Sequence, residues 1–451
     1  MPSESSVSGK LISHLGQFRS GALAPEIRRR SELCLLDSLS CFSAGRSLKH
    51  YAPIVTVAGR LFGLGSDGAP TQGRPSPFTT AYLYGEAANL LDYDDTLFFG
   101  HPGAAIVGSV LAVAADRRLS TDRLLRGIAA GYEAQWLLSA AAAPTPERGA
   151  LVRSVGVWDA MAATVGIIIA LGLDDALVER AMGLAVAHSL LPYTAKWYER
   201  PVPSLKNNLG WAGAGAVLAA DLAIAGKTGV TNPLEGDTAM WRMAGSDRWN
   251  LDPSLFDKVA VLRVGFKTYP VCWHLQEYLK TLSELLASME PEDDVVELVL
   301  TGPKDVERFC QREIISPTDT AFSLPAAFSL LISGIEPGPQ WAAFGEGDEP
   351  LRYRSVFRFE LSQERAISLG TRRGFKLKSA VVASNMNDLA LGGLDDAGVV
   401  AKHERLADPE LRAGAAIALA TENPNKGGDP RQLYDALHQI IVRQLNERAR
   451  S

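Results

Sequence analysis

Residues Leu90–Asp116 read LLDYDDTLFFGHPGAAIVGSVLAVAAD, and they place acids, a hydroxyl and a histidine directly before a long run of small apolar residues. Asp92 and Thr96 are four positions apart, so they share one face if this segment is helical. His101 precedes Pro102, a residue that favours the first helical turn, so we expect His101 at the mouth of the next helix. An acid, a hydroxyl and an imidazole that meet at a helix entrance predict a general acid/base site.

The same stretch has a plainer interpretation, as a capped helix–loop–helix with solvated acids, and the Asp-Asp-Thr triplet alone does not separate the two. Between its two halves, residues 97–100 are short, apolar and end in glycine. That pattern predicts a loop that closes back on itself.

Composition limits the class of protein. The chain has 451 residues, too many for one ordinary hydrophobic core, so two domains are expected. Hydrophobic residues make up 47% and charged residues 21%, which is typical of a soluble globular protein. The net charge of −6 argues against a nucleic-acid-binding surface.

Cysteine usage and apolar runs bear on the compartment. The four cysteines form no Cys-x-x-Cys pair and no disulfide framework, so a reducing cytoplasm is expected. The first residues, MPSESSVSGK, lack the apolar region of a signal peptide. The apolar runs 160–173 and 212–225 are rich in Ala and Gly and too short or interrupted to span a membrane, so they are interpreted as buried helices.

Residue periodicity predicts the fold class. No convincing strand precedes Val264, and the helix candidates are 25–45, 53–62, 79–96, 120–143, 160–172, 174–189 and 212–226. Alternating β-branched runs then follow at 294–300, 355–361 and 375–382, with helical segments 272–289 and 324–335 among them. From Val399 the chain is helical again. We therefore expect a mainly α fold, in which a large all-helical domain (1–266 and 399–451) is interrupted by a smaller α+β domain (267–398).

These motifs resemble the MmgE/PrpD family, whose signature is a helix ending in an Asp-Phe-Asp-Asp-Thr-like sequence, a loop, and His-Pro-Gly. The resemblance continues through an acid in the first core helix at Asp37, through Gly131–Glu133, and through a Gly-x-Thr-Gly turn at Gly226–Gly229. The family includes 2-methylcitrate dehydratases, cis-aconitate decarboxylases and iminodisuccinate epimerases. Membership implies a cofactor-independent enzyme on small polycarboxylates, a lid-like smaller domain and a homodimer.

The resemblance also assigns site residues. Asp92, Thr96 and His101 become the catalytic acid/base groups, while Lys206 and Lys267 bind carboxylates of an anionic substrate. Two alternatives stay open here, since Lys206 also fits a snorkelling surface lysine and Lys267 a hinge residue paired with an acid.

Several positions depart from the family pattern. Arg153 falls where the family usually has a histidine, Cys272 and Gln276 occupy histidine or cysteine positions, and Ala326 replaces a tyrosine. Arg153, Cys272 and His274 are therefore added to the predicted substrate-binding residues, although His274 also fits a packed residue. Such changes predict an altered substrate or altered chemistry more than loss of the site.

No cofactor and no metal site are predicted. His274 and Glu277 form the one His-x-x-Glu, and no second ligand pair accompanies them. Gly63–Gly68 spells Gly-x-Gly-x-x-Gly but lacks the strand–turn–helix context of a nucleotide site.

The leading hypothesis is a lyase that dehydrates a 2-methylcitrate-like alkylcitrate, with Ala326 leaving room for a group bulkier than methyl. A decarboxylase of cis-aconitate or a related acid, an epimerase, and a homologue without turnover are the alternatives, because one scaffold serves several reactions.

Overall fold

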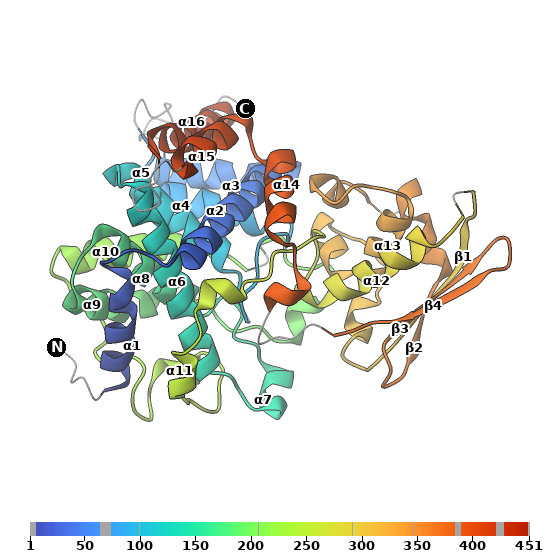
Figure 1. Ribbon diagram of the computed structural model, residues 1–451, viewed down its shortest axis with the longest axis horizontal. Helices are drawn as coiled ribbons and strands as arrows, with labels where there is room; N and C mark the ends of the chain where they lie inside the picture. Colours follow the sequence, from blue (N-terminus) through green and yellow to red (C-terminus); the bar gives the residue numbers. More distant parts are fainter. Residues whose placement is uncertain are drawn as a thin grey trace.

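The computed structural model describes residues 6–63, 74–98, 100–205, 207–290, 292–345, 347–383, 389–420 and 428–449. It is mainly helical with one small sheet, which confirms the predicted fold class (Figure 1). The helices are α1 Val7–Leu15, α2 Pro25–Arg46, α3 Ala52–Ala58, α4 Pro77–Asn89, α5 Gly108–Arg117, α6 Thr121–Ala141, α7 Pro146–Leu151, α8 Asp159–Leu171, α9 Asp175–Ala185, α10 Leu209–Ile224, α11 Met240–Met243, α12 Gln276–Ala287, α13 Leu324–Ile332, α14 Asp396–Leu406, α15 Pro409–Leu419 and α16 Arg431–Ala449. The strands are β1 Val295–Gly302, β2 Phe357–Leu361, β3 Ala366–Thr371 and β4 Lys376–Ala380.

Helices α4, α6, α8 and α10 form the centre of the helical part and cross at very short range. A Cβ atom on Gly127 of α6 would lie 2.7 Å from the carbonyl oxygen of Gly166 in α8. A Cβ atom on Gly85 of α4 would lie 2.7 Å from the Cα atom of Gly210 in α10. Small residues permit these crossings, and most of the run 160–173 is a buried core helix, as predicted. The run 212–225 is only partly buried, since Leu218 and Ile224 are exposed.

The sheet belongs to the central part of the chain. Its strand order is β2-β1-β3-β4, with β1 parallel to β2 and the other pairs antiparallel. Leu298 lies opposite Phe357 in one ladder and Leu369 in the other. Helix α12 packs on β3 and β4, and α13 contacts α12.

The buried apolar side chains fall into two clusters. One contains residues from Leu11 to Phe266 and again from Val399 to Leu445, while the other runs from Tyr269 to Val381 and adds Val202. The C-terminal helices (red in Figure 1) lie beside the N-terminal ones, with α14 on α2 and α16 on α3. The domain boundaries at 266/267 and 398/399 stay a proposal, which this clustering supports.

Some expected elements need correction. The helix predicted to end at Thr96 ends at Asn89, and the helix predicted for 53–62 is α3 followed by a π-helical turn, Gly59–Gly63. Strand β3 was not predicted, because Ser368 and Gly370 weaken its alternating pattern. Most of the Gly63–Gly68 motif lies outside the described residues.

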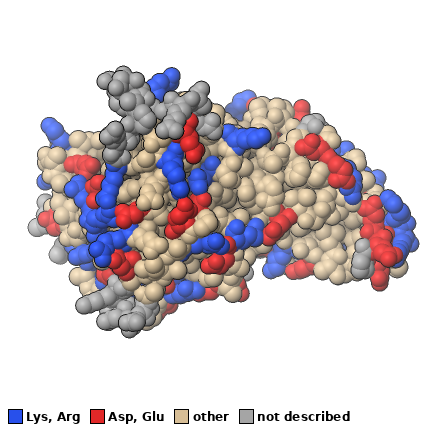
Figure 2. Space-filling view, turned by 90° about the horizontal axis from the view of Figure 1, so that it is seen from above, with Lys and Arg blue, Asp and Glu red and all other residues tan. Residues whose placement is uncertain are grey.

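On the face seen in Figure 2, Lys and Arg side chains lie among Asp and Glu side chains rather than forming one basic surface. In the parts of the chain that the structure describes, no helix combines the length and the apolar character needed to cross a membrane.

Candidate active site

The loop after α4 sets the geometry of the site. Asp92 has a φ of 51°, a left-handed conformation that is uncommon outside glycine and that stops the helix from continuing. Thr96 then pairs with Gly265 through both backbone groups, at 2.9 Å each. The expected helical face shared by Asp92 and Thr96 was therefore wrong, because this long-range pairing draws the segment out of the helix.

Residues 97–100 were expected to form a loop that closes back on itself. Leu97 and Gly100 exchange two backbone hydrogen bonds, at 3.3 and 2.9 Å, so the loop closes on itself. His101 and Pro102 follow, and a π-helical turn, Gly103–Val107, leads into α5. His101 thus lies at the entrance of a helical segment.

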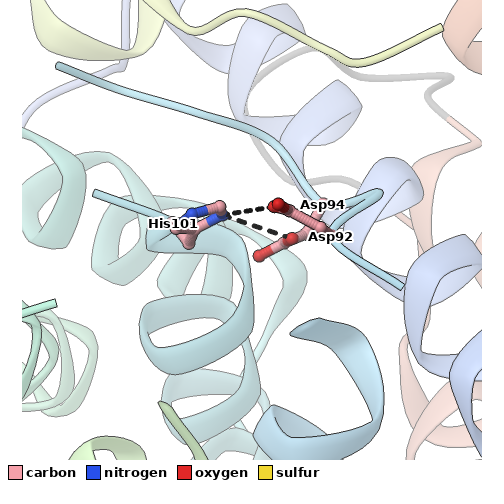
Figure 3. Close-up of side chains that lie close together, drawn as sticks. All are labelled: Asp92, Asp94 and His101. Atoms are coloured by element: carbon pink, nitrogen blue, oxygen red, sulfur yellow. Dashed lines mark ion pairs between the residues drawn. The ribbon is translucent and has the colours of Figure 1, made fainter. Parts of the chain in front are cut away.

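Two carboxylates face the imidazole of His101 (Figure 3). Its Nδ1 lies 3.3 Å from Oδ1 of Asp94 and 3.8 Å from Oδ1 of Asp92. The Asn89 amide donates to both oxygens of Asp94, at 3.0 Å each. Asn89, Asp94 and His101 therefore form a chain in which the acid can hold Nδ1 protonated and leave Nε2 for proton transfer. Asp94 is not among the site residues predicted from the sequence.

Lys267 is the partner of Asp92. Its Nζ donates to Oδ1 of Asp92 at 2.6 Å and to the Asp92 carbonyl at 2.8 Å, and the lysine is fully buried. Burial acts to lower the pKa of Lys267, but the carboxylates of Asp92 and Asp94 outweigh it and raise that pKa. Of the two interpretations of Lys267 given above, the contact with Asp92 fits a lysine that pairs with an acid. Lys267 does not line the cavity described below, so its contact with a substrate stays a prediction.

Asp95 points away from this pair. It accepts the Gly103 N–H at 2.8 Å and the Tyr132 hydroxyl at 2.5 Å. Burial, followed by the charge of Asp37, raises the pKa of Asp95 to about 8. This acid holds the helical turn after His101 in place rather than facing the imidazole.

The side chains surround a small cavity of about 60 Å³ between the helical part and the central part. Its lining includes four of the predicted groups from the helical part and two from the central part. The predicted residues are Asp92, Thr96, His101, Arg153, Cys272 and His274, and the others are Phe98, Gly100, Val155, Tyr193, Tyr198, Asn207, Trp273 and Phe322. The structure thus brings together every predicted site residue except Lys267 and Lys206, and Lys206 lies outside the described residues.

Several polar groups of the lining point to a ligand. Thr96 Oγ1, both side-chain amide atoms of Asn207 and Trp273 Nε1 are buried and have no hydrogen-bond partner among the residues that the structure describes. Buried polar groups in native proteins are nearly always satisfied, so such a set is typical of a binding site. Asn207 was missed in the sequence, where its one signal is that it follows Lys206.

Arg153 and His274 form a pair on the cavity wall. A backbone bridge to Tyr193 fixes Arg153, and its Nη1 lies 3.2 Å from His274 Nε2. Arginine can only donate, so Nε2 accepts and the imidazole is neutral. The His274 side chain is exposed, but the protein atoms around it, followed by the charges of Arg153 and Arg308, lower its pKa to about 4.

Two of the positions that depart from the family pattern, Gln276 and Ala326, do not line the cavity. The buried Gln276 amide binds the backbone of residues 268–271. Ala326 is fully buried in the central hydrophobic cluster and does not line the cavity, so the expected room for a group bulkier than methyl was wrong.

One group of side chains has the donors and spacing of a metal site. Atoms of Asp92, Asp94 and His101 lie within 4.8 Å of one another, a grouping that sequence spacing did not reveal. The Lys267 ammonium, 2.6 Å from Asp92, already supplies a positive charge there. We therefore assign the two acids to His101 and Lys267.

The fold and the cavity define a mainly helical protein in which acids and histidines line a cavity where its helical part meets an α+β part. Residues 10–251 match the family model of the MmgE/PrpD N-terminal domain, so the chain belongs to the MmgE/PrpD family. Membership supports a lyase type of function in general. A search of curated proteins finds no match to this chain.

Proposed function

We propose that this protein is a cofactor-independent lyase that acts on a small polycarboxylate, most simply by dehydrating an alkylcitrate. The observation that carries the proposal is the Asn89–Asp94–His101 chain on a cavity that Arg153 also lines. An oriented imidazole beside a cation is suited to removing a proton next to a carboxylate.

Dehydration needs proton transfer at two places. His101 takes the proton from carbon through Nε2, while Asp94 stabilises the imidazolium that forms. The hydroxyl leaves as water after Asp92 passes it a proton that the Lys267 ammonium supplies through their 2.6 Å hydrogen bond, and the Thr96 hydroxyl donates a hydrogen bond to the departing oxygen. The guanidinium of Arg153 stabilises the negative charge that builds on the substrate carboxylate, and Lys206 is predicted to assist it.

The size of the cavity supports a lid role for residues 267–398. Ligand cavities usually measure ~300–1,000 Å³, far more than the about 60 Å³ found here. Cys272, Trp273 and His274 close the cavity from the central part. We propose that this part moves away to admit the substrate.

Action in the cytoplasm stays a prediction from the cysteine pattern.

The reaction type is tested by incubating the purified protein with 2-methylcitrate, longer alkylcitrates and cis-aconitate in D₂O, followed by NMR and mass spectrometry. Dehydration yields an alkene and water, decarboxylation loses carbon dioxide, and epimerisation incorporates deuterium without loss of mass. We expect the alkene from an alkylcitrate. Unchanged substrates throughout would contradict the lyase and favour the homologue without turnover.

A further inference from the structure

A second cavity adjoins the one described above. It measures about 50 Å³ and shares Arg153 and His274 with the first, so that pair forms a wall common to both. The rest of its lining is Tyr278, Asp305, Val306, Phe309 and Arg365. The hydrogen bond from Arg153 to His274, at 3.2 Å, holds the guanidinium between the two spaces.

Tyr278 supplies a hydrogen-bond donor without an acceptor. The tyrosine is 2% exposed, and its O–H group has no acceptor within the described part of the chain. Arg365 is close enough to donate to the phenol oxygen, but a guanidinium cannot accept. Burial raises the pKa of Tyr278 to about 12 against the opposing charge of Arg365, so the phenol keeps its proton. A buried hydroxyl of this kind normally has a partner, so its place on a cavity wall indicates a ligand that accepts.

The charges around this cavity favour an anion. Arg153 and Arg365 bring two guanidinium groups, and Asp305 brings one carboxylate. Asp305 lies 3.7 Å from Arg365, a loose contact that leaves donors of the guanidinium for another acceptor. Arg308 is also close enough to lower the pKa of His274. The surplus of positive charge and the planar guanidinium donors suit a carboxylate.

We infer that this second cavity binds a distal carboxylate of the substrate, with Tyr278 and Arg365 as its donors and Arg153 shared with the reacting end. The inference rests on the proposed function and names the residues that bind the third carboxylate, which alkylcitrates and cis-aconitate carry beyond two vicinal ones. Asp305 positions Arg365, and neutral His274 positions Arg153.

Calorimetric titration with two acids that cannot be dehydrated tests the subsite. Tricarballylate has succinate's two vicinal carboxylates plus one further carboxymethyl arm. We expect Tyr278→Phe and Arg365→Gln each to weaken tricarballylate binding by about 10-fold or more, the range for a hydrogen bond to a charged group. Succinate binding should change by less than about 2-fold, since it lacks the arm.

Tyr353→Phe and Arg358→Gln are the matched controls. Their partners are Asp294 and Glu297, away from both cavities, so tricarballylate binding should be unchanged. Unchanged binding in the subsite variants, or equal losses for both acids, would overturn the subsite and leave the lyase standing. Tight, variant-sensitive tricarballylate binding without turnover of any polycarboxylate would support the subsite and contradict the lyase. No binding of tricarballylate by the unsubstituted protein would contradict the subsite directly.

Discussion

Three acids within four positions have three separate tasks. Asp92 pairs with Lys267, Asp94 faces His101, and Asp95 accepts from Tyr132 and the Gly103 N–H. The three side chains are chemically identical, so their different roles come from the different partners that the loop conformation places beside each carboxylate. Substitutions at neighbouring positions should therefore have unlike effects.

Asp159 gives a pH-dependent test of the buried acids. Its carboxyl group is fully buried without a hydrogen-bond partner among the described residues, and burial, followed by the charge of Asp94, raises its pKa from 3.8 to about 7. The folded state thus keeps the proton longer than the unfolded state, so this group's contribution to stability is full below about pH 4 and is lost as the pH rises through about 7.

We predict that Asp159→Asn gains stability relative to the unsubstituted protein as the pH rises from about 4 to about 7, with a constant difference above that range. Thermal unfolding across this range measures it. The exposed Asp237→Asn is the control and should show no such trend. A difference for Asp159→Asn that does not vary with pH would contradict the assignment.

Much of the site was predictable. Asp92, Thr96 and His101 were predicted from the signature, Arg153, Cys272 and His274 were predicted from the positions around the departures from the family pattern, and all six line one cavity. The hydrogen-bond and ion-pair partners of these residues could not be predicted from the sequence. The left-handed backbone at Asp92 and the pairing of Thr96 with Gly265, distant in sequence, decide that Asp94 faces His101 and that Lys267 turns to Asp92. No local pattern encodes either feature.

At the scale of elements, α2 and α14 are joined through an ion pair. Lys402 of α14 donates to Asp37 of α2 at 2.7 Å, to the Tyr93 carbonyl at 2.7 Å and to the Lys267 carbonyl at 3.4 Å. Both charged groups are buried, and Asp37 outweighs the effect of burial to raise the pKa of Lys402. One lysine therefore links the C-terminal helices to both segments that carry the site.

Removing that lysine should destabilise the fold. Lys402→Met leaves the Asp37 carboxylate buried without its cation, and breaking such a pair costs about 3–5 kcal/mol. Urea unfolding measures the change, and Lys280→Met on the exposed side of α12 serves as the control. The double variant Asp37→Leu/Lys402→Met should lose less than Lys402→Met alone, since no unpaired charge is left. A loss for Lys402→Met no larger than that of the control would contradict the role of this pair.

The order of elements was predictable because helical and alternating runs are long and separated in the sequence. The predicted strands at 294–300, 355–361 and 375–382 correspond to β1, β2 and β4. Strand β3 could not be predicted from its own residues, because pairing on both sides, with β1 and β4, stabilises it. The ends of helices also depend on tertiary contacts. Helix α4 ends at Asn89, before the predicted end at Thr96, because Thr96 pairs with Gly265.

At the scale of the whole molecule, the helical part exposes large apolar side chains. Trp211 and Leu218 of α10 are each 39% exposed and Ile224 is 47% exposed, and Leu191 and Val230 in loops and Met243 at the end of α11 are exposed as well. Exposed apolar groups of this kind mark interaction surfaces. They support the prediction of a homodimer formed by the helical part.

Light scattering tests this prediction. We expect a dimer at micromolar concentration, and a monomer for Leu218→Lys, because a charge would be buried in the contact. Leu361→Lys, at the exposed end of β2, should leave the dimer intact. A monomeric unsubstituted protein at micromolar concentration would contradict the prediction.

The central claim is that His101 and Asp94 act together as the acid/base pair of a polycarboxylate lyase. The measurement that tests it most directly is kcat, on the best substrate found, for His101→Asn, Asp94→Asn and the double variant. We predict a fall of about 10²–10⁴-fold in each single variant, with KM nearly unchanged. The double variant should be no slower than the slower single variant, because groups that act as a unit do not add. Turnover of His101→Asn within about 2-fold of the unsubstituted protein, far below that range, would contradict the account.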